Sequence, residues 1–467
     1  MRNRYSEDDA RAMVKHYAAQ GVHEDVALRV YTSRLLGCEP GLVQHGGGNT
    51  SVKTVIRDPI GEEVAVICVK GSGWDLERIE PPGLPAVRLE PLRRLAALDA
   101  LRDEDMVNLV RANLIDQASP TPSVETLLHA FLPHKFVDHT HSSAVLALVD
   151  RPDGESVCRD LYGDRVALLP YVKPGFALSK LARAAHAAHP GCEGLVLLKH
   201  GIFSFGATAR DAYERMIALV TMAEAKLASE EPARFVAMRL SEPADVAAVA
   251  PIVRGALAVP VDLNEGQWTR FVLEHRASDR IMNFVNGRDV ARYSQGGVAT
   301  PDHVIRTKPW PVILPAPEAG KLGSYGAAAR EAVAKYQTRY RAYFERHNAE
   351  SIPKKLPLDP QPRVALVPGV GLFGFGASAR TRRSRPTWPR PGSKSSRPPR
   401  PARASRASRS ATSSRWNTGR WSRPSWGSRP RSRCSGRSSR SPARAASSAR
   451  PWPRPSGVKA RTSRCWT

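Results

Sequence analysis

Short apolar runs of strand length alternate with helical segments through the first 230 residues, and this alternation is the strongest constraint on the fold. The apolar runs occupy residues 64–69, 136–141 and 194–199. Between and after them, helices are expected over 123–133 and from Thr208 to about 229, where Thr208 and Asp211 have the spacing of a capping box. Strands that alternate with helices in this way predict an α/β fold with a central sheet.

Composition divides the rest of the chain. Residues 236–352 are mixed, with a helix expected over 320–346, and a proline cluster at 353–362 precedes an apolar, glycine-rich strand-and-turn segment. From residue 381 the chain consists mainly of Arg, Ser, Pro, Ala and Trp, with little to bury, which predicts disorder. The expected parts are a first domain, a mixed α/β extension, a linker with a strand and turn, and a disordered tail, over 1–235, 236–352, 353–380 and 381–467.

The formal net charge of +26 suggests nucleic acid as a partner, but its location removes that inference. Residues 381–467 contain 22 Arg, 2 Lys and no acidic residue, so they carry +24 of the total. The rest of the chain is therefore close to neutral, and basicity says nothing about its ligand. No specific nucleic acid is expected. Nonspecific binding of phosphates by the tail stays open as an alternative.

Cysteine usage and the N-terminus indicate a reduced, soluble, cytoplasmic protein. The six cysteines show neither metal-ligand nor redox-motif spacing. The N-terminal sequence MRNRYSEDDARAMVKHY has no apolar core like that of a signal peptide, and no run of about 20 apolar residues occurs. We therefore expect no membrane partner.

His139 and His141 form the first feature that suggests chemistry. Residues two apart on a strand face the same side, so these imidazoles could bind one metal ion. A catalytic zinc needs a third protein ligand, and His200 is the best candidate because it ends the apolar run before Gly201. The alternative is that these are ordinary histidines, since the chain contains 13 of them.

Glu125 precedes His139 by fourteen residues. A carboxylate near a metal-bound carbonyl could move a proton to or from the adjacent carbon. Taken alone, Glu125 is equally well explained as a solvated glutamate in the first turn of a helix, where the helix dipole favours it.

Two glycine-rich segments, Gly46–Ser51 and Lys70–Gly73, could bind a phosphate group. Glycines let backbone N–H groups converge on an anion, and Asn49 and Ser72 add side-chain donors. Tight turns use the same residues more often than phosphate sites do, so each segment alone is weak.

Taken together, these segments resemble the class II aldolase/adducin family. The chain has GGGNTS, KGSG, PSVE, HTH and KHG in the family's order, and YVKPGFAL at 171–178 fits the family's Tyr-x-x-Pro-Gly segment. The resemblance covers residues 24–230, and the combination is far more specific than any single motif.

The resemblance implies a three-layer αβα domain that cleaves a phosphorylated ketose. One zinc ion per subunit on His139, His141 and His200 would bind the ketose oxygens and stabilise the enediolate left by carbon–carbon cleavage. Glu125 would carry the proton at that carbon. The substrate phosphate would be held by Asn49, Ser72, Gly73 and Ser123.

Segments beyond residue 230 are similar to bifunctional rhamnulose-1-phosphate aldolase/short-chain dehydrogenase proteins, in which an aldolase precedes a nucleotide-dependent dehydrogenase. These segments are 254–255, 284–287, 300–308 and 363–376. The implied products are dihydroxyacetone phosphate and lactaldehyde. The tail offers no Gly-x-x-x-Gly-x-Gly loop, so no NAD site is expected in this chain. The tail resembles coding DNA translated out of frame, a hypothesis that sequencing around codons 376–381 would test.

Two alternatives to this activity stay open. One is another sugar-phosphate aldolase, or an epimerase, because the family shares its zinc chemistry. The other is a metal-free, adducin-like interaction protein. Family members often form homo-oligomers that complete their sites across subunits, so a homo-oligomer is expected.

Overall fold

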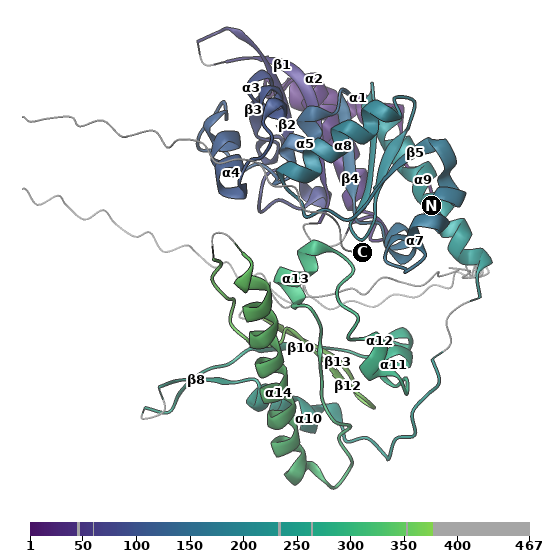
Figure 1. The fold of residues 1–467 in the computed structure, drawn as a ribbon, viewed down its shortest axis with the longest axis vertical. Helices are drawn as coiled ribbons and strands as arrows, with labels where there is room; N and C mark the ends of the chain where they lie inside the picture. Colours follow the sequence, from purple (N-terminus) through teal and green to yellow (C-terminus); the bar gives the residue numbers. More distant parts are fainter. Residues whose placement is uncertain (44–46, 59, 232–234, 263–264, 352–353, 377–467) are drawn as a thin grey trace, which may run out of the picture. The chain divides into compact units, whose positions relative to one another are not determined.

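The computed structural model describes residues 1–43, 47–58, 60–231, 235–262, 265–351 and 354–376. Gly46 and the predicted disordered tail, 381–467, lie outside the described residues. A seven-stranded sheet and a four-stranded sheet organise the described part of the chain (Figure 1). No helix within it is long and apolar enough to cross a membrane.

The seven-stranded sheet has the strand order β3-β2-β1-β4-β7-β6-β5. Its strands are β1 Asn49–Arg57, β2 Glu63–Val69, β3 Ala86–Arg88, β4 Phe136–Thr140, β5 Val166–Leu169, β6 Gly194–Leu197 and β7 Gly201–Gly206. Neighbouring strands are antiparallel except β5 and β6, which are parallel. The predicted α/β fold with a central sheet is confirmed.

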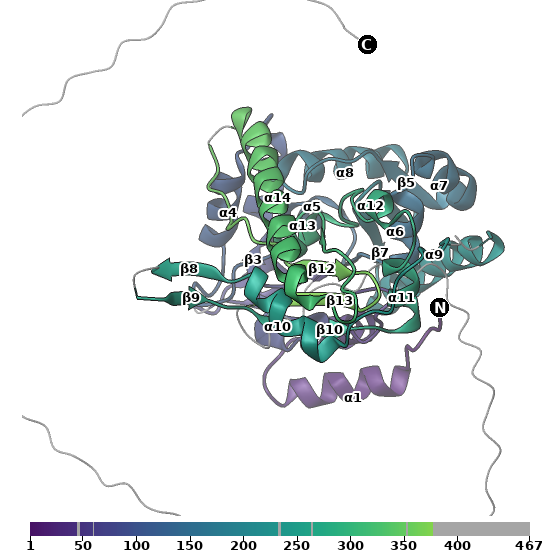
Figure 2. The same ribbon diagram turned by 90° about the horizontal axis from the view of Figure 1, so that it is seen from below.

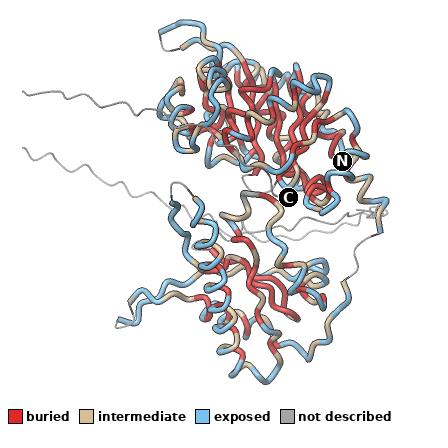
Figure 3. The backbone as a smooth tube through the Cα atoms, in the orientation of Figure 1, coloured by how far each residue is buried: buried red, intermediate tan, exposed pale blue. Residues whose placement is uncertain are grey.

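Helices cover both faces of this sheet, because successive residues of a strand point to opposite sides. In β2, Val66 and Cys68 join one core, while Ile67 and Val69 join another. The helices on the first face are α1 Glu7–Ala18, α2 Glu24–Gly37, α6 Ser143–Val149, α7 Gly154–Tyr162 and α9 Ala209–Ser229. Those on the second are α3 Leu89–Arg94, α4 Asp103–Ala112, α5 Thr126–Phe131 and α8 Phe176–Ala188. Buried residues concentrate along the strands between these layers (Figure 3).

Local signals fix where several of these helices begin. The Ser6 side chain accepts from the Asp9 N–H at the start of α1, and Thr208 and Asp211 form a reciprocal capping box at the start of α9. Short 3-10 turns lie at Leu76–Arg78, Pro81–Gly83, Leu95–Ala97 and Gly163–Arg165. The capping box that the sequence predicts at residue 208 is therefore present.

The region after α9 has its own sheet, with strand order β10-β13-β12-β11, and its own core. The strands are β10 Val272–Arg276, β11 Val312–Ile313, β12 Val364–Val367 and β13 Gly371–Gly376; a separate hairpin pairs β8 Val259–Asp262 with β9 Gln267–Thr269. The long helix α14 packs on α10, and the hairpin projects beside them (Figure 2). The helices are α10 Val246–Ala256, α11 Asp279–Val285, α12 Val290–Tyr293, α13 Pro301–Thr307 and α14 Leu322–Ala349. The sheet thus joins the expected extension to the expected strand-and-turn segment, and the domain boundaries stay a prediction.

The pair His134 and His186, on the second face of the seven-stranded sheet, should make the protein less stable below pH 6.5. His134 stacks on Phe205 and its Nε2 lies 2.8 Å from Nε2 of His186. Burial, aided by His186, lowers the pKa of His134 to about 4. The unfolded chain therefore binds more protons as the pH falls from 6.5 towards 4, and stability falls with it. We expect urea unfolding of the His134→Gln variant to show a shallower pH slope, by up to about 1 kcal/mol at pH 5 after allowance for solvent screening. Equal slopes would contradict this.

Candidate functional site

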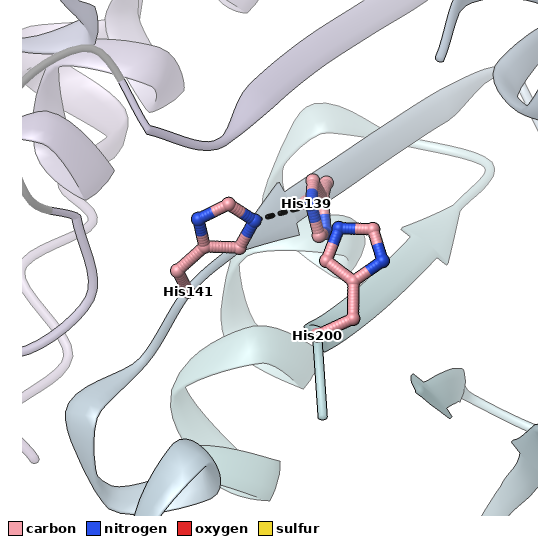
Figure 4. Close-up of side chains that lie close together, drawn as sticks. All are labelled: His139, His141 and His200. Atoms are coloured by element: carbon pink, nitrogen blue, oxygen red, sulfur yellow. Dashed lines mark hydrogen bonds between the residues drawn. The ribbon is translucent and has the colours of Figure 1, made fainter. Parts of the chain in front are cut away.

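The three predicted metal ligands lie together at one end of the seven-stranded sheet. His139 lies in β4, His141 follows the last residue of β4, and His200 lies in the turn between β6 and β7. One ring nitrogen from each histidine lies within 4.8 Å of those of the other two, and Nε2 of His139 is 3.0 Å from Nε2 of His141 (Figure 4). All three side chains are buried. The geometry thus brings together three imidazoles that are scattered over 62 residues of sequence.

Antiparallel pairing accounts for this convergence. His139 pairs with Phe203 in the register between β4 and β7, and β7 returns along β6 through a tight turn that contains His200. Lys199, immediately before His200, has a φ of 59°, which is unusual for a residue with a side chain. The turn therefore places His200 next to the end of β4.

Two glycines allow the backbone to approach the end of β4. A Cβ on Gly48, which has a φ of 68°, would lie 2.6 Å from the carbonyl oxygen of His139. A Cβ on Gly201 would lie 2.6 Å from the carbonyl oxygen of Thr140 and 3.2 Å from the His139 ring. The Gly-Asn and His-Gly pairs seen in the sequence therefore have a steric role at this site.

Replacing Gly201 with alanine is expected to displace the histidine rings. The new methyl group would overlap backbone that cannot move without breaking the β4–β7 ladder, so we expect a loss of about 1–3 kcal/mol in unfolding free energy. Metal affinity should fall as well, and both are measured by thermal unfolding and metal titration. Gly191→Ala is the matched control, because a Cβ there meets nothing within 4 Å. Equal behaviour of the two variants would contradict the steric argument.

The electronic state of His139 suits metal binding. Its Nδ1 lies 3.0 Å from the Ile202 carbonyl oxygen, so Nδ1–H donates there and Nε2 keeps its lone pair. The Phe203 ring stacks on the imidazole at 4.0 Å. Burial lowers the pKa of both His139 and His141 well below the usual value for histidine, which keeps them neutral, as metal ligation requires.

Glu125 lies beside the three histidines. The Oε2 atom is 3.4 Å from Nε2 of His139, and Oε1 is 3.3 Å from Nε2 of His200. Oε2 also accepts a 2.7 Å hydrogen bond from Nδ2 of Asn49. The carboxylate is buried, and it precedes the first residue of α5.

The donor set fits a divalent ion such as zinc. Among the described residues, Oε1 of Glu125 and Nδ1 of His200 are buried and have no hydrogen-bond partner. Nitrogen ligands of a tetrahedral zinc lie about 3.4 Å apart, since each is about 2.0–2.1 Å from the ion, and the His139–His141 separation of 3.0 Å is close to this. Three imidazoles beside one carboxylate are a typical catalytic zinc environment.

The segments that carry three of the predicted phosphate ligands, Ser72, Gly73 and Ser123, lie side by side. Gly71 and Pro122 form an isolated bridge, the Ser72 N–H donates to Thr121, and the Ser123 N–H donates to Lys70. Ser72 and Gly73 are exposed, and the Ser123 hydroxyl accepts from the Glu125 N–H. These hydrogen bonds occupy the backbone N–H groups of Ser72 and Ser123, so the hydroxyl groups of these two residues are the donors that remain to bind an anion. The phosphate assignments stay predictions.

Sequence reasoning did not single out two buried residues of this site, Lys70 and His129. The positive charge of Lys70 contributes to the lowered pKa of both His139 and His141. His129 hydrogen-bonds Asn49. Its position four residues after Glu125, on the same face of a helix, is the signal that could have identified it.

Comparisons with protein families agree with this geometry. The model "Class II Aldolase and Adducin N-terminal domain" matches residues 27–227, which contain all three histidines and Glu125. The model "Aldolase class II, second domain" matches residues 244–384. The chain belongs to the class II aldolase and adducin family.

This class II aldolase family chain is similar both to a curated protein and to proteins of known structure. An uncharacterized oxidoreductase of Bacillus subtilis, YuxG, is 34% identical over 380 residues, which are 78% of this chain and 53% of that protein. The chain therefore spans about half the length of this curated relative.

Among solved structures, the N-terminal class II aldolase domain of a conserved Thermoplasma acidophilum protein is 38% identical, with a TM-score of 0.43, and the match covers 49% of this chain and 99% of that one. L-fuculose-1-phosphate aldolase of Thermus thermophilus is 21% identical, with a TM-score of 0.29, and the match covers 43% and 94%.

Proposed function

We propose that this protein is a zinc-dependent class II aldehyde-lyase that cleaves a ketose 1-phosphate. The observation that carries the proposal is the convergence of three buried imidazoles beside the Glu125 carboxylate. The proposed substrate is rhamnulose 1-phosphate, which would yield dihydroxyacetone phosphate and lactaldehyde.

Each residue of the site has a distinct proposed role. His139, His141 and His200 would hold the zinc ion, which when bound supplies a Lewis acid for the carbonyl and hydroxyl oxygens of the ketose. Glu125 would carry the proton that the carbon next to the carbonyl gains as the carbon–carbon bond breaks. The burial of all four groups excludes water and strengthens their interactions with a charged substrate.

The phosphate would bind where the two paired segments meet. The Ser72 and Ser123 hydroxyl groups, the backbone around Gly73 and the Asn49 side chain are the proposed donors. The positive charge of Lys70, which acts on the histidines, would also favour a dianionic substrate.

The choice of rhamnulose 1-phosphate rests on the resemblance of the segments beyond residue 230 to aldolase/short-chain dehydrogenase proteins. YuxG, named as an oxidoreductase and matched over 53% of its length, supports this choice. We also propose that the protein works as a cytoplasmic homo-oligomer, which light scattering of the purified chain would test.

A coupled assay tests the activity. The purified protein, incubated with rhamnulose 1-phosphate, should release dihydroxyacetone phosphate, measured by NADH oxidation with glycerol-3-phosphate dehydrogenase. A chelator should abolish the release and added zinc should restore it. Fuculose 1-phosphate and ribulose 1-phosphate serve as alternative substrates.

The outcomes separate the candidate functions. Preferred cleavage of another ketose phosphate would correct the substrate, and epimer formation without cleavage would make the protein an epimerase. If the protein binds no metal and converts none of these sugars, the proposed enzymatic activity is wrong, and an adducin-like interaction role is favoured.

A further inference from the structure

A buried chain of hydrogen bonds leads from β1 to the carboxylate of Glu125. The Ser51 hydroxyl lies 2.8 Å from Nδ1 of His129, Nε2 of His129 lies 2.5 Å from Oδ1 of Asn49, and Nδ2 of Asn49 lies 2.7 Å from Oε2 of Glu125. All four side chains are buried, with at most 6% of any of them exposed. A connected chain of this kind has to be satisfied at each link, because an unpaired buried polar group is costly.

Only one arrangement of protons satisfies the chain. A carboxylate accepts and cannot donate, so the amide nitrogen of Asn49 has to face Glu125 and the amide oxygen has to face His129. His129 must then donate from Nε2, which leaves Nδ1 to accept from the Ser51 hydroxyl. Burial lowers the pKa of His129 to about 3, so the ring is neutral with one donor and one acceptor, as the chain requires.

The fold holds both ends of the chain in place. Asn49 and Ser51 are two residues apart on β1 and so face the same side of the sheet, where they meet α5. Glu125 immediately precedes α5, and His129 lies within α5, four residues further along the chain. The Phe203 ring, which stacks on His139, also makes a T-shaped contact with His129, with the ring centroids 5.5 Å apart. The hydrogen-bond chain thus joins β1, α5 and the metal-binding end of the sheet.

We propose that His129 is a positioning residue: by donating to Asn49 it fixes the orientation of the carboxamide, which in turn aims Glu125 at the histidine cluster. The inference deepens the proposed aldol cleavage and rests on it. Without the His129 donor, the carboxamide of Asn49 can rotate and set its oxygen against the carboxylate. Glu125 then turns away from the histidines, and the proton step slows.

Two substitutions at residue 129 test this role. His129→Leu removes the donor, and we expect kcat to fall by about 10–100-fold, the usual cost of removing a partner that orients a group at a metal site. KM should change by less than kcat, and zinc content should be unchanged, because the imidazole hydrogen-bonds Ser51 and Asn49 rather than the three metal-binding histidines. His129→Gln restores a side-chain N–H donor and should recover at least part of the lost kcat.

His186→Leu is the matched control. It removes another buried imidazole, on α8, which is hydrogen-bonded to His134 and takes no part in the hydrogen-bond chain from Ser51 to Glu125. Its kcat should equal that of the unsubstituted protein even if its melting temperature falls. A fall in kcat as large as that of His129→Leu would mean that losing any buried imidazole is enough, and would overturn the proposal.

A spectroscopic measurement tests the hydrogen-bond chain without relying on catalysis. In the full-length, zinc-loaded protein labelled with ¹⁵N-histidine, His129 should give the shifts of a neutral Nε2–H tautomer that does not titrate between pH 6 and 9. The Ser51→Ala variant, which removes the donor to Nδ1, should alter these shifts and serves if His129→Leu does not fold. An Nδ1–H tautomer, or a charge change in this range, would overturn the proposal.

These results separate the two claims. If the unsubstituted, zinc-loaded protein cleaves no sugar phosphate, the proposed function fails. The tautomer of His129 still decides whether the hydrogen-bond chain exists as described. If that protein is active and His129→Leu keeps its full kcat, the positioning role fails while the proposed function stands. Equal losses of zinc and kcat in His129→Leu would also overturn the positioning role, because they indicate collapse of the whole site.

Discussion

Replacing His200 with alanine is expected to remove most of the bound metal and to lower kcat/KM for sugar-phosphate cleavage by on the order of 10³-fold. A bound metal supplies several kcal/mol of transition-state stabilisation, and each 1.4 kcal/mol is a factor of ten in rate. The loss should be this large because His139 and His141, both from the end of β4, would then be the only imidazoles of the cluster. Metal analysis of the dialysed protein and the dihydroxyacetone phosphate assay provide the two measurements.

The matched control is His189→Ala, which removes an exposed imidazole at the end of α8. It should retain metal and activity. A His200→Ala protein that keeps its zinc and cleaves at the normal rate would show that the third ligand lies elsewhere.

Replacing Asp138 with asparagine is expected to lower the free energy of unfolding by about 3–5 kcal/mol. Asp138 precedes His139 on β4, and its Oδ1 lies 2.6 Å from Nη1 of Arg29 on α2; neither side chain is exposed. Removing the carboxylate leaves the buried guanidinium charged without its partner, which costs more than the pair itself contributes. Urea denaturation at pH 7.5 measures the effect.

Two further variants distinguish the stability cost of an unpaired buried charge from the cost of losing an ion-pair contact. Arg29→Met combined with Asp138→Leu removes both charges, and it should recover much of the stability. Glu155→Gln breaks an exposed pair with Arg159, 2.8 Å long, and should cost no more than about 0.5 kcal/mol. A cost below 1 kcal/mol for Asp138→Asn would show that water or another group compensates Arg29.

Apolar runs and capping residues were sufficient to predict much of the αβα domain. The runs at 64–69, 136–141 and 194–199 correspond to β2, β4 and β6, and the expected helix after Thr208 is α9. β1 and β7 were not predicted. β1 carries the polar side chains Ser51 and Lys53 into the interior, which obscures its apolar pattern. β7 is apolar, but it is only six residues long and has a glycine at each end, so it is easily taken for part of a turn.

The site, too, could be predicted only in part, because some of its contacts depend on the pairing of distant segments. The spacing of His139 and His141 is visible in the sequence because a strand places residues two apart on one face. His200 was predictable as a candidate, but its place next to them depends on the pairing of β4 with β7. The link from His129 to Asn49 spans 80 residues and depends on which side of α5 meets β1, which no local pattern specifies.

The antiparallel pairing of β4 with β7 also ties metal binding to folding. In the unfolded chain His200 is separated from His139 by 61 residues, so the three histidines do not converge there, and the proposed metal ion would bind the native state preferentially. By mass action, zinc at 100 times its dissociation constant would add about 2.7 kcal/mol to the stability of the native state. Zinc supply would then set the lifetime of the folded protein as well as its chemistry, and a zinc-starved cell would clear the unloaded chain sooner.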